Sequence, residues 1–559
     1  MADPTRRLLD PVPQEDGSQV THSFATPVAF RIRGAVHVGS RKVIPVIFVP
    51  GTMGTNLRVR RDIPLPPDYP LEAGDPAWRP PNGMIESVQF ADLWGQRAPF
   101  ERQLILHPDL VEVDDTGDLD VASCNLSAAE MRARGWGELH HGSYGPLLWE
   151  LQSHLEMTFR VDAQGKRHIR RRWLEVISAL RDGPRQHWSG RAIEALTDSE
   201  LEHFAGYQYP VYAVGYNWLR SCGESAGRLE QRVREMIAWW RRRRHDCDKV
   251  ILLTHSMGGL VARACAQRIP DQIAGVVHGV MPAFGAPLAY RRFTCGTESS
   301  YPGNGALDNY IAGRFADVGG RTTEATTPVL AVAPGAIELL PNRSYPQPWL
   351  HIRVTRASGP PAGTGYLQLP NESSPNPYQL YRDMESWYRL INPALANPAG
   401  LYQEDGGVKE RIGLAIDSAE SFHDGLGDYH HPVTFAFYGQ DPAHVAYGQI
   451  HWVAQLTTAT SMGLALTPAD IRKGRYLVHD PDGARTVEIG GEQILTFRLE
   501  QQEAAGDDTV PFASGAGVKA RLALPTRGYR HQDCYKDRRM ILLTFHFIVK
   551  IVQASHGNA

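Results

Sequence analysis

The sequence is poor in cysteine and has no strong excess of either charge. The cysteines among its 559 residues are Cys124, Cys222, Cys247, Cys265, Cys295 and Cys534. They are too few and too scattered for a disulfide framework, and no pair has the spacing of a zinc ribbon. The formal net charge of -3 creates no field that would attract a polyanion. A nucleic-acid partner is therefore not expected, and a reducing compartment is compatible with the composition.

Long apolar runs are also missing. The first residues, MADPTRRLLDPVPQEDGSQ, contain proline and acidic residues where a secretory signal peptide needs an uninterrupted apolar stretch. No window approaches the roughly 18 apolar residues of a membrane span. We therefore expect a globular protein that is made in the cytoplasm without a signal peptide. Its 42% of hydrophobic residues are enough to fill one large core or two ordinary ones.

Short apolar runs predict an α/β fold with a mostly parallel sheet and helices on both faces. Five runs are expected to be strands: Val43–Val49, Val211–Tyr216, Val250–Leu253, Ile273–Val277 and Val433–Tyr438. They are apolar on both faces, as the strands of a helix-covered parallel sheet are. Between the second and third runs, one helical stripe is formed by Leu229, Val233, Met236, Ile237 and Trp240. A second helix is predicted over residues 260–267, between the third and fourth runs.

Two long stretches interrupt this alternation. Residues 60–205 and 290–430 contain clusters of proline and glycine, and we expect them to be insertions that form a cap or lid over the sheet. Residues 1–40 are expected to be an N-terminal extension, and residues 41–559 a single domain. A hairpin is predicted at residues 475–489, where Asp-Pro-Asp-Gly supplies the turn.

Two serines compete for the role of a nucleophile. Residues 223–227, GESAG, match the G-x-S-x-G elbow of serine esterases, but a polar, irregular segment precedes them. We interpret Ser225 as the N-cap of the following helix. Ser256 instead follows a predicted strand directly and is followed by a helix, which is the context that an elbow requires. Thr254 replaces the first glycine of the motif, and the alternative for Ser256 is a loop without chemistry.

Six motifs then occur in the order typical of one enzyme family. They are VIFVPGTMGTNL, VGYNWLRS, KVILLTHSMGGLVAR, PGAIELLP, GDDTVP and HQDCY. In this order the chain resembles the LCAT-like lipases of the α/β-hydrolase fold. It is also similar to the phospholipase (Tle) effectors of bacterial type VI secretion systems. The resemblance extends from about residue 43 to residue 551 and is weak inside both insertions.

The resemblance assigns a catalytic triad. By motif, Ser256 matches the nucleophile, Asp507 the acid and His531 the base, in the chain order that this fold uses. Two other acids stay open, because Asp508 is the next residue and Asp441 follows a predicted strand, where many members of the wider fold carry their acid. An Asx turn without chemistry is the alternative for both residues of the Asp507-Asp508 pair. The other downstream histidine, in an apolar run near the C-terminus, is expected to be a core residue.

An oxyanion hole is expected beside Ser256. One donor should be the backbone N–H of Met257, and the other should come from the loop after the first strand, from Thr52 or Met53. The alternative is a glycine turn that only ends the strand.

A metal site is not predicted. His423, Asp424, Asp428, His430 and His431 are suitable ligand types, but their spacing matches no strong motif, and a solvated loop is the preferred interpretation. The chemistry expected of the triad needs no cofactor, and a calcium requirement is left open.

The sequence therefore predicts a serine lipase or esterase that hydrolyses acyl esters through an acyl-enzyme intermediate. Three alternatives stay open: an acyltransferase, a soluble carboxylesterase, and a non-catalytic binding protein of the same fold. The resemblance implies a phospholipid substrate in a target-cell membrane and export by a type VI system. It also implies an immunity protein and a component of the secretion apparatus as partners.

Overall fold

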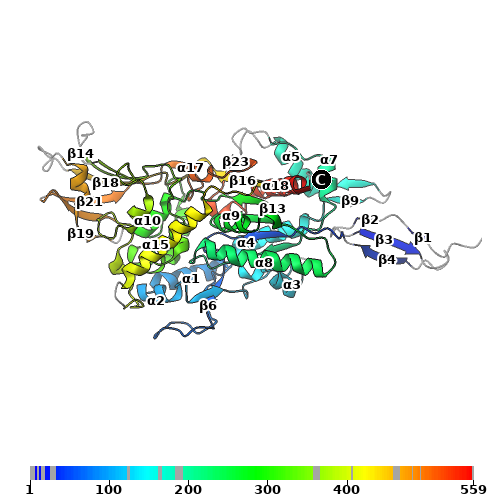
Figure 1. The fold of residues 1–559 in the computed structure, drawn as a ribbon, viewed down its shortest axis with the longest axis horizontal. Coiled ribbons are helices and arrows are strands. Elements are labelled where there is room, and N and C mark those ends of the chain that lie inside the picture. Colours follow the sequence, from blue (N-terminus) through cyan, green and yellow to red (C-terminus); the bar gives the residue numbers. More distant parts are fainter. Residues whose placement is uncertain are drawn as a thin grey trace, which may run out of the picture.

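The computed structural model describes most of the chain. It describes residues 40–556 except 123–125, 162–165, 183–192, 357–365, 404–406, 457–465, 481–482 and 492. Before residue 40 it describes four strands, β1 (Arg7–Leu8), β2 (Val12–Pro13), β3 (Gln19–Phe24) and β4 (Arg33–Val38). These strands form a separate antiparallel sheet that projects from one end of the elongated molecule (Figure 1).

A parallel sheet forms the centre of the molecule. Its strands are β5 (Val46–Val49), β11 (Val211–Ala213), β12 (Val250–His255), β13 (Ile273–Gly279), β16 (Thr434–Gly439) and β23 (Leu522–Thr526). They lie in the order β11-β5-β12-β13-β16-β23, and every neighbouring pair is parallel. All five predicted strands are confirmed, and β23 is an addition to them. The α/β fold class is confirmed as well.

Helices cover both faces of this sheet. Successive side chains of each strand point to opposite faces, and apolar residues on both faces are buried by these helices. Val46 and Phe48 of β5 pack into a core with α4 (His141–His154) and α18 (Arg538–His556). Ile47 and Val49 face the opposite way, into a core with α8 (Cys222–Arg242) and α9 (Gly258–Arg268). Both predicted helices are therefore present. His546 is buried in α18, as expected of a core residue.

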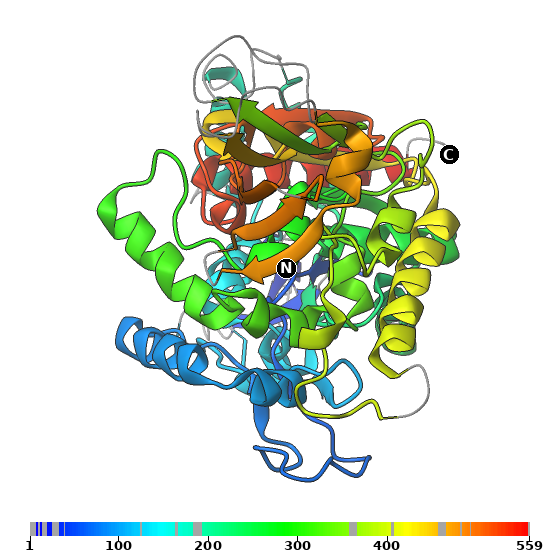
Figure 2. The same ribbon diagram turned by 90° about the vertical axis from the view of Figure 1, so that its left-hand side faces the viewer.

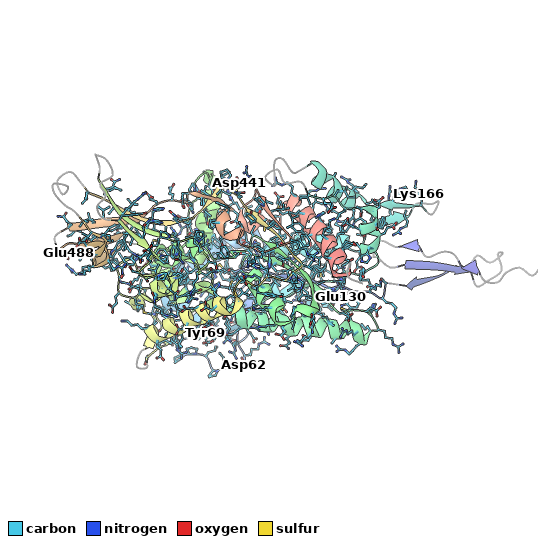
Figure 3. The ribbon with its side chains drawn as sticks, turned by 45° about the horizontal axis from the view of Figure 1, so that its top comes forward. Asp62, Tyr69, Glu130, Lys166, Asp441 and Glu488 are labelled. Atoms are coloured by element: carbon cyan, nitrogen blue, oxygen red, sulfur yellow. The ribbon has the colours of Figure 1, made fainter. Side chains whose placement is uncertain are left out.

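A second, mixed sheet lies at the other end of the molecule and has its own core. Its strands are β14 (Leu350–Arg356), β15 (Tyr366–Leu369), β18 (Ile450–Leu456), β19 (Arg475–His479), β20 (Arg485–Ile489) and β21 (Gln493–Leu499). The order is β15-β14-β18-β21-β20-β19. Glu488 of β20 marks this end in Figure 3, and Lys166 lies near the other end. Some of these strands precede residue 430, the predicted end of the second insertion, and others follow it. The exact extent of the insertions stays a prediction.

The predicted hairpin forms part of this second sheet. β19 and β20 pair in antiparallel fashion, with Arg475 opposite Glu488. The middle two residues of the expected turn lie outside the described residues.

Two further helices lie side by side at the edge of the core that contains α8 and α9, to which Trp94 and Phe90 belong. They are α1 (Met84–Gln96) and α11 (Ala306–Gly319), which pack against each other (Figure 2). Several of their large apolar side chains are exposed: Met84, Ile85 and Leu93 on α1, and Leu307, Tyr310, Ile311 and Phe315 on α11. Within the described part of the chain, no helix combines the length and the apolar character needed to cross a bilayer.

Candidate active site

Ser256 occupies a sharp turn between a strand and a helix. β12 ends at His255, α9 begins at Gly258, and Ser256 between them has a positive φ of 52°. This left-handed conformation is unfavourable for a residue with a side chain. The Ser256 N–H donates to the carbonyl oxygen of Gly279 at 2.9 Å, which ties the turn to the end of β13. The turn therefore holds Ser256 at the carboxyl edge of the sheet.

The glycines after Ser256 are required by close packing. A Cβ on Gly258 would lie 2.4 Å from the carbonyl oxygen of Pro50 and 2.5 Å from that of Val49. These are backbone atoms, which cannot move aside easily. A Cβ on Gly51 would in turn lie 3.0 Å from the Cβ of Ser256. The elbow and the loop after β5 thus pass each other at the distance that only glycine allows.

Thr254, the departure from the motif, fits without a clash. Its side chain is fully buried and points toward β13, where its Oγ1 lies 3.0 Å from Nδ1 of His278. Its carbonyl oxygen accepts a hydrogen bond of 2.9 Å from the Tyr535 hydroxyl. The elbow accommodates a threonine here because the close backbone contacts are made by Gly258, on the helix side of Ser256.

Three side chains from separate loops meet at this turn. His531 Nε2 lies 2.8 Å from Ser256 Oγ, and His531 Nδ1 lies 2.9 Å from Asp507 Oδ2. The other oxygen of Asp507 accepts backbone N–H bonds from Val510 at 2.7 Å and Thr509 at 3.2 Å. The structure thus brings together all three residues that the sequence predicts as a triad, and each of them is buried.

The surroundings of His531 favour a protonated imidazole. Burial lowers the pKa of His531, but the adjacent carboxylate of Asp507 acts in the opposite direction by charge and by hydrogen bonding. The charge of Asp508 adds to the increase, and the pKa is raised overall. A ring that is bonded to a carboxylate through Nδ1 presents Nε2 to Ser256 as a proton acceptor. The arrangement can remove a proton from a serine hydroxyl and stabilise the imidazolium that forms.

The two rival acids have other partners. Asp508 has a positive φ of 73°, and its Oδ1 accepts a bond of 2.7 Å from the Thr509 hydroxyl. Burial, followed by the charge of Asp507, raises the pKa of Asp508 to about 6. Asp441 accepts the Gly528 N–H at 2.8 Å and lies 2.9 Å from Nδ1 of His444. Asp507 alone of these three acids is hydrogen-bonded to the His531 ring in the described structure.

The loop after β5 lies beside Ser256. Thr52 Oγ1 is 3.0 Å from Met257 Sδ, and Met53 has a positive φ of 62°. The indole N–H of Trp78 holds the Met53 carbonyl oxygen at 2.8 Å. Among the described residues, the backbone N–H groups of Thr52, Met53 and Met257 have no hydrogen-bond acceptor. Free N–H groups beside a nucleophile are what an oxyanion hole requires.

Ser225 is not the cap of α8, and this prediction was wrong. The N-cap is Ser221, whose side chain accepts the Gly223 N–H, and Ser225 is buried in the first turn of the helix. The reason is a tertiary contact that the local sequence does not show. The buried carboxylate of Glu338 accepts the Ser221 hydroxyl at 2.6 Å and the Cys222 N–H at 2.8 Å. Glu338 is part of the PGAIELLP motif. Its place in that motif was the only sequence signal that could have pointed to its role at the start of α8.

The histidines and acids of residues 423–431 do not converge on one point. His423 is bonded to the Glu338 carbonyl oxygen at 2.9 Å, Asp424 pairs with Arg343, and Asp428 pairs with Lys519. Within the described ranges, no three histidine, cysteine or acidic side chains are grouped as metal ligands. The side chains of this segment have structural partners instead.

A polar cavity of about 430 Å³ lies near the end of β21, and none of its lining residues is Ser256, Asp507 or His531. Glu298, Tyr301 and Asn309 are among its lining residues. The segment that carries them also contacts the residue before His531, because Arg530 Nη2 lies 3.0 Å from Asn304 Oδ1 and 2.9 Å from Asp308 Oδ2. The segment between Tyr301 and Asn309 therefore touches both the cavity and the residue next to His531.

Comparison with known proteins gives a substantial similarity to solved structures. No protein-family model matches this sequence, and no curated protein matches it. Among solved structures, the fold is similar to a chain in the crystal structure of the Tle4–Tli4 complex, with a TM-score of 0.69 and 28% sequence identity. The match covers 91% of this chain and 98% of that chain. The likeness therefore includes nearly the whole of both chains and is not limited to the central sheet.

Proposed function

We propose that this protein is a serine hydrolase that cleaves acyl esters of phospholipids. The observation that carries the proposal is the pair of contacts at His531, 2.8 Å to Ser256 Oγ and 2.9 Å to Asp507 Oδ2. Ser256 is the nucleophile, His531 the general base and Asp507 the acid that orients it. The strained turn at Ser256 supports this assignment, because such strain is typical of functional sites.

The reaction has two halves. His531 removes the proton from Ser256 Oγ as this oxygen attacks the ester carbonyl, and the backbone N–H groups of Met257 and of Thr52 or Met53 hold the oxyanion. His531 then donates the proton to the leaving alcohol, which leaves an acyl-enzyme. Water, deprotonated by His531, attacks this ester and releases the fatty acid. The residues of the chain suffice for each step.

Lipid substrates are supported by the surroundings of the site. The exposed apolar side chains of α1 and α11 are suited to contact with lipid, and α11 reaches the site through Asp308, which pairs with Arg530 beside His531. The similarity to a chain of the Tle4–Tli4 complex supports an effector that is exported by a type VI system. It also supports a dedicated immunity protein that protects the producing cell.

The first experiment compares two serine variants on phospholipid vesicles. Fatty-acid release from a phosphatidylethanolamine and phosphatidylglycerol mixture is measured for the wild type, Ser256→Ala and Ser225→Ala. Ser225→Ala is a matched control because it removes the hydroxyl of a buried serine in the motif-like GESAG segment. We expect Ser256→Ala alone to lose activity. Loss in Ser225→Ala and retention in Ser256→Ala would overturn the proposal.

Three further measurements separate the alternatives. An added sterol or alcohol that becomes acylated would indicate an acyltransferase, and activity that falls with acyl-chain length would indicate a soluble esterase. Absence of labelling by a fluorophosphonate would indicate a non-catalytic protein.

For the effector function, expression directed to the periplasm is expected to be toxic and cytoplasmic expression much less so. Equal growth in both cases would contradict it.

A further inference from the structure

A chain of buried hydrogen bonds runs beside Ser256 and links two of the loops around it. The Gly51 N–H lies 3.2 Å from the Tyr144 hydroxyl oxygen, and that oxygen lies 2.9 Å from Nδ1 of His255. Nε2 of His255 lies 3.0 Å from the carbonyl oxygen of His531. Tyr144 and His255 are each 1% exposed, so water does not compete for these bonds.

The direction of every bond in this chain is determined. The Gly51 N–H can only donate, so the Tyr144 oxygen accepts it and directs its own O–H to Nδ1 of His255. The His531 carbonyl can only accept, so Nε2 of His255 carries the proton. Burial, followed by the charge of His531, lowers the pKa of His255 to about 3. His255 is therefore neutral, with one tautomer.

The ends of this chain are functional segments. Gly51 begins the loop that carries the proposed oxyanion donors Thr52 and Met53. At the other end, the main chain of His531 is held on both sides, because its N–H donates to the Asp507 carbonyl oxygen at 2.7 Å and its C=O accepts from His255. The orientation of an imidazole ring depends on the main chain that carries it. The chain thus fixes donors and base relative to each other.

We propose that Tyr144 and His255 are positioning residues that hold the oxyanion loop and the general base in register on either side of Ser256. The proposal rests on the catalytic function proposed above. Neither side chain is hydrogen-bonded to Ser256 Oγ or to the ring nitrogens of His531, and the His255 ring only packs against the His531 ring. Their loss should therefore reduce turnover and leave substrate binding unchanged. A displacement of about 1 Å in such a site lowers turnover by up to about 100-fold.

The test removes one hydrogen-bonding group at a time. Tyr144→Phe keeps the ring, which packs 4.9 Å from Phe48, and removes only the hydroxyl. His255→Leu removes both bonds, whereas His255→Gln keeps an N–H donor near the Nε2 position. The matched control is Tyr209→Phe, which deletes another fully buried hydroxyl, bonded at 2.7 Å to the Phe204 carbonyl oxygen in a different part of the core.

Measurements include kcat, KM, melting temperature and the rate of fluorophosphonate labelling. For Tyr144→Phe and His255→Leu we expect kcat and the labelling rate to fall about 10- to 100-fold, with KM within about twofold. His255→Gln should recover much of the loss, and Tyr209→Phe should lower only the melting temperature. If His255→Leu does not fold, Tyr144→Phe alone decides, because it removes a single oxygen.

Two results are distinguishable as failures. If Tyr144→Phe shows the same kcat as Tyr209→Phe and differs only in stability, the two residues have a structural role and the inference is wrong. If Ser256→Ala is as active as the wild type, the proposed function itself fails. Loss of activity in Ser256→Ala together with unchanged activity in Tyr144→Phe would refute the inference and leave the proposed function standing.

Discussion

Replacing Asp507 by asparagine should abolish most of the activity through a single proton. Oδ1 of Asp507 accepts two backbone N–H bonds, from Val510 at 2.7 Å and Thr509 at 3.2 Å. In Asp507→Asn these donors fix the amide oxygen in the Oδ1 position. The NH₂ group then faces Nδ1 of His531, which must become an acceptor. The ring proton moves to Nε2, and His531 can no longer accept the Ser256 proton.

The expected magnitude follows from this change of tautomer. In serine triads the same substitution lowers kcat about 10⁴-fold while the geometry is kept, which corresponds to about 5 kcal/mol of transition-state stabilisation. We expect a loss of this size in fatty-acid release from vesicles at saturating lipid. The melting temperature should change little, because the backbone bonds to the side chain are retained.

The two rival acids provide the controls. Asp508→Asn should change kcat only a few-fold, because the amide still accepts the Thr509 hydroxyl and burial already favours the uncharged form of this acid. Asp441→Asn should lower stability by about 1 kcal/mol, since one oxygen cannot accept all the bonds that two now accept. The reasoning is refuted if Asp507→Asn keeps more than about a tenth of the wild-type kcat, or if Asp441→Asn loses as much.

Three further predictions concern pH and packing. Because the pKa of His531 is raised, activity should fall as pH decreases through a value above 6.5, and a profile with its acid limb below 6 would contradict this. Burial raises the pKa of Glu338 from 4.5 to about 7, so the folded state binds this proton more tightly, and stability should decrease by up to about 3 kcal/mol as pH rises from 4.5 to 7. Glu338→Gln should flatten that part of the profile in denaturant titrations, and an unchanged slope would exclude Glu338 as its source. Gly258→Ala should destabilise the fold by about 1–3 kcal/mol and abolish labelling of Ser256, whereas Gly413→Ala, with nothing within 4 Å of the new Cβ, should be neutral or stabilising; equal effects would argue against the close approach at the elbow.

The central sheet was predictable because its strands are buried on both faces. Each of the five predicted runs is a short, continuously apolar segment, and each forms a strand of the sheet. The sixth strand, β23, was missed because Leu522–Thr526 is short, contains Pro525 and lies at the edge of the sheet. The strands of the second sheet alternate between buried and more exposed positions, as in β21. That weaker pattern, inside segments rich in proline and glycine, did not identify a second core.

The start of α8 shows a limit of local patterns. Ser221 and Ser225 are both suitable helix caps by residue type. The choice is made by Glu338, more than a hundred positions away, whose carboxylate accepts the hydroxyl of Ser221 and the next N–H. A rule that considers neighbours within a few residues cannot include this partner. The site residues were predictable for a different reason, because motif order carries information about which loops meet at one edge of the sheet.

The backbone conformation at the site could not be predicted from residue types, because residues other than glycine disfavour a positive φ. Within the described chain, six residues other than glycine have a positive φ, and four of them, Met53, Ser256, Val280 and Asp508, lie at or next to the candidate site. Each costs of order 1–3 kcal/mol unless the surrounding structure imposes it. The contacts that impose it are long-range: Trp78 on the Met53 carbonyl, and the Gly279 carbonyl on the Ser256 N–H. Prediction from residue propensities therefore fails at this site, where three loops are held in strained conformations around one serine. This concentration of strain supports a functional role for the turn at Ser256 independently of any motif.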